Sequence, residues 1–76
     1  MEFNDFTSKL GDVFEDTDLS ILTPETKFRD LDEWSSIVHL SLIAFLDEEF
    51  DIQIDSQNLE KLITLGDLFN YIQENQ

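Results

Sequence analysis

The chain has 76 residues and no cysteine, and its 4 basic residues against 18 acidic ones give a formal net charge of −14 at pH 7. This balance excludes nucleic-acid binding, which begins with a basic footprint, and it argues against binding to an anionic membrane surface. The missing cysteines exclude disulfides and thiolate metal sites, so apolar packing must hold together a chain that buries only about 60% of its unfolded surface.

The length predicts a single domain, residues 1–76, and we expect it to be a monomer. No apolar run approaches the ~20 residues of a membrane span, and the N-terminus has no secretory-signal pattern, so we expect a cytoplasmic location without a membrane partner. The acidic surface suits partner proteins that carry basic patches, and serving solubility alone is an equally open reading of the charge.

The first predicted element is a helix from about Glu2 to Phe14. Its apolar residues recur at spacings of three and four, which places them on one helical face: Phe3, Phe6, Leu10, Val13 and Phe14. Gly11 weakens this helix by about 1 kcal/mol but does not forbid it.

A long loop is predicted from Glu15 to Ser35, because turn-forming residues interrupt the periodicity and Pro24 disfavours helix at Thr23. Scattered apolar residues should pin this loop to the core: Leu19, Ile21, Leu22, Phe28 and Leu31. A short helical turn is compatible with the segment. A structureless loop of this length is uncommon in a small domain and is usually functional.

The segment from Ser36 to Phe50 predicts the strongest helix of the chain, with no glycine or proline to interrupt it. One apolar stripe runs along it: Val38, Leu42, Leu46 and Phe50. Either Ser35 or Ser36 can cap the free N–H groups at its start.

The segment 51–55 alternates as a strand would, but it has no partner strand, so we expect an extended connection with Ile52 and Ile54 in the core. Asp55 or Ser56 then caps a short helix through about Lys61.

Thr64 and Asp67 form a capping box that opens a last helix, whose inward residues are Leu65, Leu68, Phe69 and Ile72. The predicted fold class is therefore all-α. It is a small antiparallel-type four-helix bundle, with three longer helices, one short helix and a long loop between the first and second helices.

Conventional active-site constellations are missing from the sequence. A single histidine, His39, cannot form a zinc pair, both glycines stand alone, and the EF-hand pattern does not occur. His39 follows Ser36 by three residues, but it is better explained as a side chain at the rim of the core than as a catalytic group. We expect no catalytic residue and no metal site.

The order of features is nevertheless distinctive. A helix and a long loop lead to Trp34-Ser35-Ser36-Ile37 at a helix start, and that helix ends in Leu46-Asp47-Glu48-Glu49-Phe50. The segment Ile63-Thr64-Leu65-Gly66-Asp67-Leu68 opens the last helix. Over nearly its whole length the chain resembles the acyl carrier proteins, whose attachment site reads Asp-Ser-Leu before a helix ending in Leu-Glu-Glu-Glu-Phe. With Trp34 two residues before Ser36 and His39-Leu40 after it, the motif resembles that of carriers from specialised pathways. The family's acid before the serine is Ser35 here, and Asp32 or Glu33 is close enough to supply that charge.

The resemblance implies that Ser36, in register with Phe50, carries a covalent 4'-phosphopantetheine arm derived from coenzyme A. It implies an acyl or aminoacyl carrier that holds its cargo as a thioester and is not itself an enzyme. The implied partners are a phosphopantetheinyl transferase, which uses Mg²⁺, and acyl-loading, acyl-transferring or condensing enzymes with basic docking patches.

The helix that Ser36 begins should present the docking face, through Ile37, Leu40, Ala44, Asp47 and Glu48. Local sequence leaves alternatives open, because a serine before an apolar helical run is usually only a cap and surface acids are usually only solvated. An acidic helical interaction module without a covalent group is the main alternative function. A metal-binding or catalytic mini-protein fits the sequence less well.

Overall fold

A computed structural model describes residues 1–75 and shows four α-helices. They are α1 (Phe3–Lys9), α2 (Ser36–Phe50), α3 (Ser56–Glu60) and α4 (Leu65–Asn75). Within the described residues the only β-type pairing is an isolated bridge between Lys27 and Thr64. The predicted all-α fold, with three longer helices and one short one, is confirmed.

The helices surround one apolar core that draws on every segment of the chain. Its fully buried side chains are Phe6, Leu10, Phe14, Phe28, Leu42, Leu46, Leu59, Leu65, Leu68 and Ile72. Burying a side chain of this size stabilises the fold by about 1.5–3 kcal/mol. This cluster therefore supplies the stabilisation of a chain that has no cysteine and so no disulfide. The predicted core positions of α2 and α4 are confirmed at Leu42, Leu46, Leu65, Leu68 and Ile72.

The first helix is shorter than the sequence predicts. α1 ends at Lys9, and the chain tightens into a 3₁₀ turn over Leu10–Asp12 instead of continuing as an α-helix to Phe14. Gly11 lies in this turn, where a Cβ would come 3.3 Å from the Leu19 side chain that packs beside it. The apolar pattern still reaches the core, because Leu10, Val13 and Phe14 are all buried.

The long connection between α1 and α2 contains two 3₁₀ turns, Leu19–Ile21 and Phe28–Asp30. Its predicted apolar anchors pack on the core at Leu19, Leu22, Phe28 and Leu31, but the prediction for Ile21 is wrong, because that side chain is 59% exposed.

This connection is tied to the start of α4 by backbone hydrogen bonds, since Leu65 donates to the Thr26 carbonyl and Gly66 to the Pro24 carbonyl, both at 2.8 Å. A Cβ on Gly66 would lie only 2.9 Å from that Pro24 oxygen. A glycine is therefore required for the loop to approach α4 this closely.

The ends of the later helices follow the predicted chemistry. Asp51 ends α2 in the left-handed conformation, with φ of 56°, and Ile52 and Ile54 are buried beyond it. The Asp55 carboxylate caps α3 by accepting from the Asn58 N–H at 2.8 Å, and α3 ends at Glu60, one residue earlier than predicted.

The predicted capping box of α4 is present in both directions. The Thr64 N–H donates to the Asp67 carboxylate, and the Asp67 N–H donates to the Thr64 hydroxyl, each at 3.1 Å.

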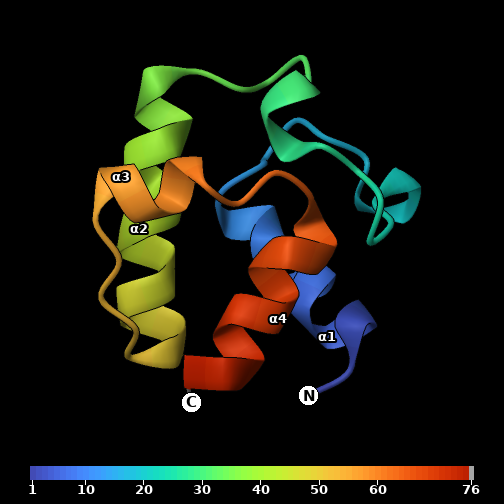
Figure 1. Ribbon diagram of the computed structural model, residues 1–76. Coiled ribbons are helices and arrows are strands. Elements are labelled where there is room, and N and C mark those ends of the chain that lie inside the picture. The colour runs from blue at the N-terminus through green and yellow to red at the C-terminus, as the bar shows by residue number, and fades with distance from the viewer. Residues whose placement is uncertain (76) are drawn as a thin grey trace.

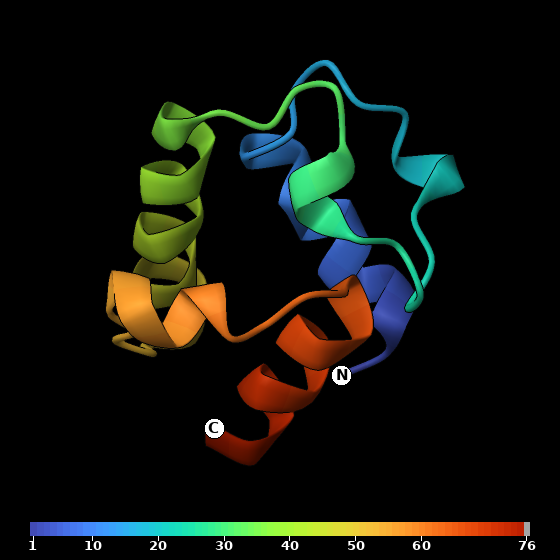
Figure 2. The ribbon, with the colours of Figure 1, turned by 45° about the horizontal axis from the view of Figure 1, so that its top comes forward.

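The arrangement places the start of α2 away from the chain termini. Figure 1 shows the N- and C-termini near each other at one end of the molecule and the first turn of α2 at the other. The connection from α1 crosses above the bundle to reach that turn, and α3 lies beside α2 in both views (Figures 1 and 2). The segment where Ser36 begins its helix is therefore at an outer corner of the fold.

Candidate functional site

The start of α2 assigns different roles to its two serines. Ser35 is the cap, because its backbone is extended and its hydroxyl accepts from the Val38 N–H at 3.2 Å. Ser36 is the first helical residue and is exposed, and within the described residues its hydroxyl has no hydrogen-bond partner. The capping role that sequence alone left open between the two serines thus belongs to Ser35.

Asp and Ser are about equally good at the cap position. Ser35 can therefore stand where the family pattern has an acid without loss of the helix start. What the substitution removes is a negative charge beside Ser36, not the local geometry.

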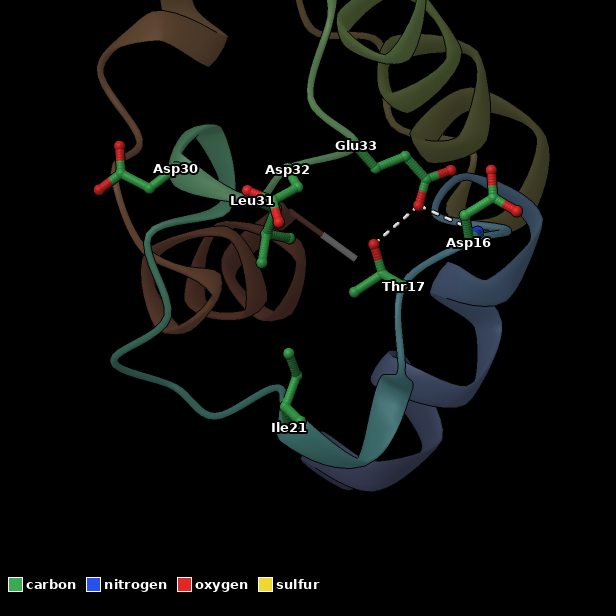
Figure 3. Close-up of a pocket in the computed structure, with 7 residues that line it drawn as sticks. All are labelled: Asp16, Thr17, Ile21, Asp30, Leu31, Asp32 and Glu33. Carbon is green, nitrogen blue, oxygen red and sulfur yellow. Dashed lines mark hydrogen bonds between the residues drawn. The ribbon is translucent and has the colours of Figure 1, made fainter.

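The two acids nearest to that position differ in their surroundings. The Glu33 carboxylate accepts from the Thr17 hydroxyl at 2.7 Å and from the Asp16 N–H at 3.1 Å, so it is engaged in holding the loop. Figure 3 shows these contacts at the edge of a hollow of about 580 Å³ between two stretches of the loop. Asp32 is exposed, and no hydrogen bond engages its carboxylate among the described contacts. Of the two, Asp32 is the acid that remains available to a partner.

A groove of about 420 Å³ adjoins Ser36. We call it the Trp34 groove, and its lining comes from the loop, α2 and α3: Arg29, Trp34, Ser35, Ser36, His39, Ser56 and Glu60. It combines one aromatic wall, one guanidinium, one imidazole, hydroxyls and one carboxylate.

Arg29 is held firmly at the groove. Its guanidinium donates to the carbonyls of Leu59 in α3 and of Leu62 just beyond it, each at 2.6 Å, and the Leu59 carbonyl also accepts from the Leu62 N–H at 3.0 Å. The same guanidinium lies 4.8 Å from the centre of the Phe28 ring and 5.9 Å from that of Trp34, within the range of cation–π attraction.

Trp34 packs under the loop and also forms a wall of the groove. Its ring lies 6.3 Å from Phe14 and 5.5 Å from Phe28, centre to centre. His39 meets the same indole edge-on at 5.9 Å, and its Nε2 lies 2.8 Å from the Ser56 hydroxyl. The tautomer of His39 decides which of these two atoms donates. His39 is half-buried, which agrees with its predicted place at the rim of the core.

The outer face of α2 carries the predicted docking residues. Ile37 and Leu40 are 75% and 64% exposed, and Ala44, Asp47 and Glu48 are exposed as well. The opposite face buries Val38, Leu42, Phe45 and Leu46. The first three turns of α2 are therefore apolar on both sides, although a helix with apolar residues all round is normally buried on all sides.

The described residues hold no cluster of side chains that could bind a metal ion. Among residues 1–75 no three acidic or histidine side chains come together as a metal site would require. In the same residues, no helix has the length and apolar character needed to cross a membrane.

Sequence reasoning did not assign Arg29 or Ser56 to the site. Both lie next to Ser36 only because the loop and α3 fold against the start of α2, and no spacing rule connects three such segments. The one available signal for Arg29 was its rarity, since it is the only arginine in a strongly acidic chain.

Comparison with known proteins finds several relatives that carry the same name. No protein-family model matches the chain. Among curated proteins, the acyl carrier protein of Helicobacter pylori (strain J99 / ATCC 700824) is 37% identical over 60 residues, which cover 78% of this chain and 76% of that protein. The acyl carrier protein of Exiguobacterium sp. (strain ATCC BAA-1283 / AT1b) is 36% identical over 56 residues, covering 74% of this chain and 71% of that protein.

Proposed function

The chain belongs to the acyl carrier protein family, and from this premise we propose that Ser36 carries a 4'-phosphopantetheine arm that holds acyl or aminoacyl groups as thioesters. The observation that carries the proposal is the state of the Ser36 hydroxyl. It is exposed at an outer corner of the fold, while its neighbour Ser35 performs the capping that would otherwise engage it. A transferase can therefore reach this oxygen without unwinding α2.

The attachment step needs only one group from this chain. The Ser36 oxygen forms a bond to the phosphorus nearest the pantetheine in coenzyme A, and the P–O bond within the pyrophosphate breaks. Adenosine 3',5'-bisphosphate leaves, and the hydroxyl proton passes to a base of the Mg²⁺-dependent phosphopantetheinyl transferase. The product is a phosphodiester on Ser36.

The start of α2 suits that phosphodiester. Within the described residues the backbone N–H groups of Ser36 and Ile37 have no partner, whereas those of Val38 and His39 bond to Ser35. Free N–H groups and the positive end of the helix dipole stabilise an anion at this position by about 0.3–1 kcal/mol when it is exposed.

The chain itself supplies position and recognition. When attached, the arm supplies the terminal thiol on which an acyl group is held, so the chain needs no nucleophile or general base of its own. The family's proteins are carriers, and we propose that this chain likewise acts on no substrate and is acted upon by its partners.

We propose the outer face of α2 as the surface that these partners bind. Ile37, Leu40 and Ala44 form an exposed apolar strip that leads away from Ser36, and Asp47 and Glu48 add negative charge toward its far end. A transferase and acyl-loading or condensing enzymes with an apolar spot and a basic patch complement this surface. A partner that binds this strip contacts the chain away from Ser36 and is still positioned beside the arm.

The proposal is tested by incubating the purified chain with coenzyme A, Mg²⁺ and a transferase of broad specificity, followed by intact-mass measurement. We expect the gain of one phosphopantetheine group per chain. A chain that stays unmodified with several such transferases contradicts the carrier function, and an acidic interaction module without a covalent group then becomes the better explanation.

A further inference from the structure

We propose that Glu33 is a positioning residue for the attachment step, because its carboxylate fixes the segment that presents Ser36 to the transferase. Its hydrogen bonds from the Thr17 hydroxyl at 2.7 Å and from the Asp16 N–H at 3.1 Å are called the Glu33 clasp below. The inference rests on the proposed function, since it concerns the presentation of Ser36. Glu33 acts through the position of Ser36 and not by contact with coenzyme A.

The segment that leads into α2, residues 31–35, has few other directional ties to the fold. Within the described residues its other hydrogen bonds join groups only three or four positions apart, such as the Trp34 N–H and the Leu31 carbonyl at 2.9 Å. The Glu33 clasp instead spans 16 and 17 positions of the sequence. Leu31 and Trp34 also pack on the core, but apolar packing is non-directional, so the clasp sets the place of this segment against the start of the loop.

The chemistry of the clasp suits this task. A distance of 2.7 Å between the Thr17 hydroxyl and the Glu33 carboxylate is short, and hydrogen bonds to an ionised acceptor are roughly twice as strong as neutral ones. Both side chains are half-buried, so water competes less for this bond than it would at an open surface. Figure 3 shows Glu33 reaching across to Thr17 and to the Asp16 nitrogen.

The clasp determines how many chains present Ser36 where a transferase binds it. When the clasp is open, residues 31–34 can move while the Ser35 cap still holds the start of α2. The transferase then binds only the fraction of chains whose segment is in place, and the apparent dissociation constant rises by the reciprocal of that fraction. A bound chain is the same substrate in either case, so kcat should not change. An effect on KM without one on kcat is therefore the signature of positioning.

The test is a steady-state loading assay with coenzyme A, Mg²⁺ and a transferase, in which the concentration of the full chain is varied. Thr17→Val replaces the donor hydroxyl by a methyl group and leaves the charge of Glu33 in place. We expect KM for the chain to rise about three- to tenfold at unchanged kcat, which corresponds to a positioned fraction of about 0.1–0.3. Thr17→Ser keeps the hydroxyl and should have a KM near that of the wild type.

A second pair of variants removes the acceptor itself. Glu33→Ala should raise KM in the same way as Thr17→Val. Glu25→Ala is the control, because Glu25 is exposed in the same loop and lies outside the clasp, so this change removes the same charge without opening it. Its KM should stay at the wild-type value.

Hydrogen exchange at the Asp16 amide measures the clasp without any enzyme. This N–H donates to Glu33, so its exchange should be slowed in the wild type and faster in Thr17→Val and in Glu33→Ala. Circular dichroism at the assay temperature verifies that each variant is folded. A wild-type Asp16 amide that exchanges as fast as one in an unstructured peptide overturns the proposal.

The outcomes of the loading assay separate the clasp from the carrier function. A wild-type chain that loads with the same KM as a folded Thr17→Val chain overturns the clasp and leaves the carrier function intact. A lower kcat at unchanged KM overturns it as well. A wild-type chain that gains no phosphopantetheine group overturns the carrier function, and the positioning role with it. Should Thr17→Val fail to fold, the comparison of Glu33→Ala with Glu25→Ala and the wild-type exchange of Asp16 decide.

Discussion

The Ser35 hydroxyl accepts a hydrogen bond from the Val38 N–H at 3.2 Å, and this contact leaves the hydroxyl of the next residue free at the start of α2. Two adjacent serines thus have separate tasks. One stabilises the helix start, and the other is available for modification.

The cap predicts a stability difference between the two serines. Ser35→Ala removes the acceptor for the Val38 N–H and should lower the free energy of unfolding by about 1 kcal/mol. In a domain of this size that loss lowers Tm by roughly 4–8 °C. Ser36→Ala, at an exposed position without a hydrogen bond, should change stability by no more than about 0.5 kcal/mol. Thermal unfolding followed by circular dichroism compares them, and an equal loss in both would contradict the assigned cap.

Gly66 predicts a steric limit at the junction of the loop and α4. Gly66→Ala should cost about 1–3 kcal/mol, because its Cβ would lie 2.9 Å from the Pro24 carbonyl oxygen, and relieving this contact strains two paired backbones. Gly11→Ala is the control, since its Cβ would meet only the end of the Leu19 side chain at 3.3 Å. Urea unfolding of the pair tests this, and a Gly66→Ala chain as stable as the wild type would show that the loop is not held as described.

The capping box of α4 predicts a pH dependence of stability. Hydrogen bonds from the backbone N–H of Thr64, and then of Ile63, lower the pKa of Asp67 below its ordinary value. With a folded-state pKa below the unfolded one, this contribution is fully present above the unfolded pKa of about 3.9. It is lost as pH falls through the folded pKa.

Asp67→Asn should therefore destabilise the chain at pH 7, and the difference from the wild type should shrink at a pH below the lowered folded-state pKa of Asp67, where the carboxylate takes up its proton. Urea unfolding at both pH values measures it, with Asp12→Asn as a surface control. A difference that is the same at both pH values would mean that the charge of Asp67 adds nothing to the cap.

The acidic end of α2 predicts an effect on partner docking that does not arise from a change in the stability of the fold. Glu48→Lys should slow loading by the transferase by up to about tenfold at low salt, because it places a like charge opposite a basic patch. Glu74→Lys on α4 is the matched control, with the same change in net charge at another exposed position. The gap between the two should close at high salt. Equal rates at low salt would place the docking surface elsewhere.

Much of the fold was predictable because its determinants are local. The bounds of α2 follow from the Ser35 cap and an uninterrupted apolar period, and the capping box of α4 is written in four consecutive residues. The end of α1 was not predictable in the same way. Residues 10–12 stay helical but tighten where Leu19 packs beside Gly11, a contact between the helix and the loop that periodicity does not contain.

The candidate site likewise has one part that the sequence predicts and another that only tertiary packing brings together. Ser36 could be singled out because it stands in register with Phe50 in the sequence pattern of the acyl carrier proteins. The Trp34 groove could not, because Arg29 and Ser56 reach it only through tertiary packing of the loop and α3. The surroundings of the two nearby acids could not be predicted either, since the Glu33 carboxylate accepts from the Thr17 hydroxyl and Asp32 is exposed.

The most direct test of the account is the intact mass of two variants after incubation with coenzyme A, Mg²⁺ and a transferase. Ser35→Ala should gain one phosphopantetheine group, despite its weaker helix start, and Ser36→Ala should gain none while remaining as folded as the wild type. A mass gain that survives Ser36→Ala, or that is lost only in a folded Ser35→Ala chain, would contradict the assignment of Ser36 as the attachment site.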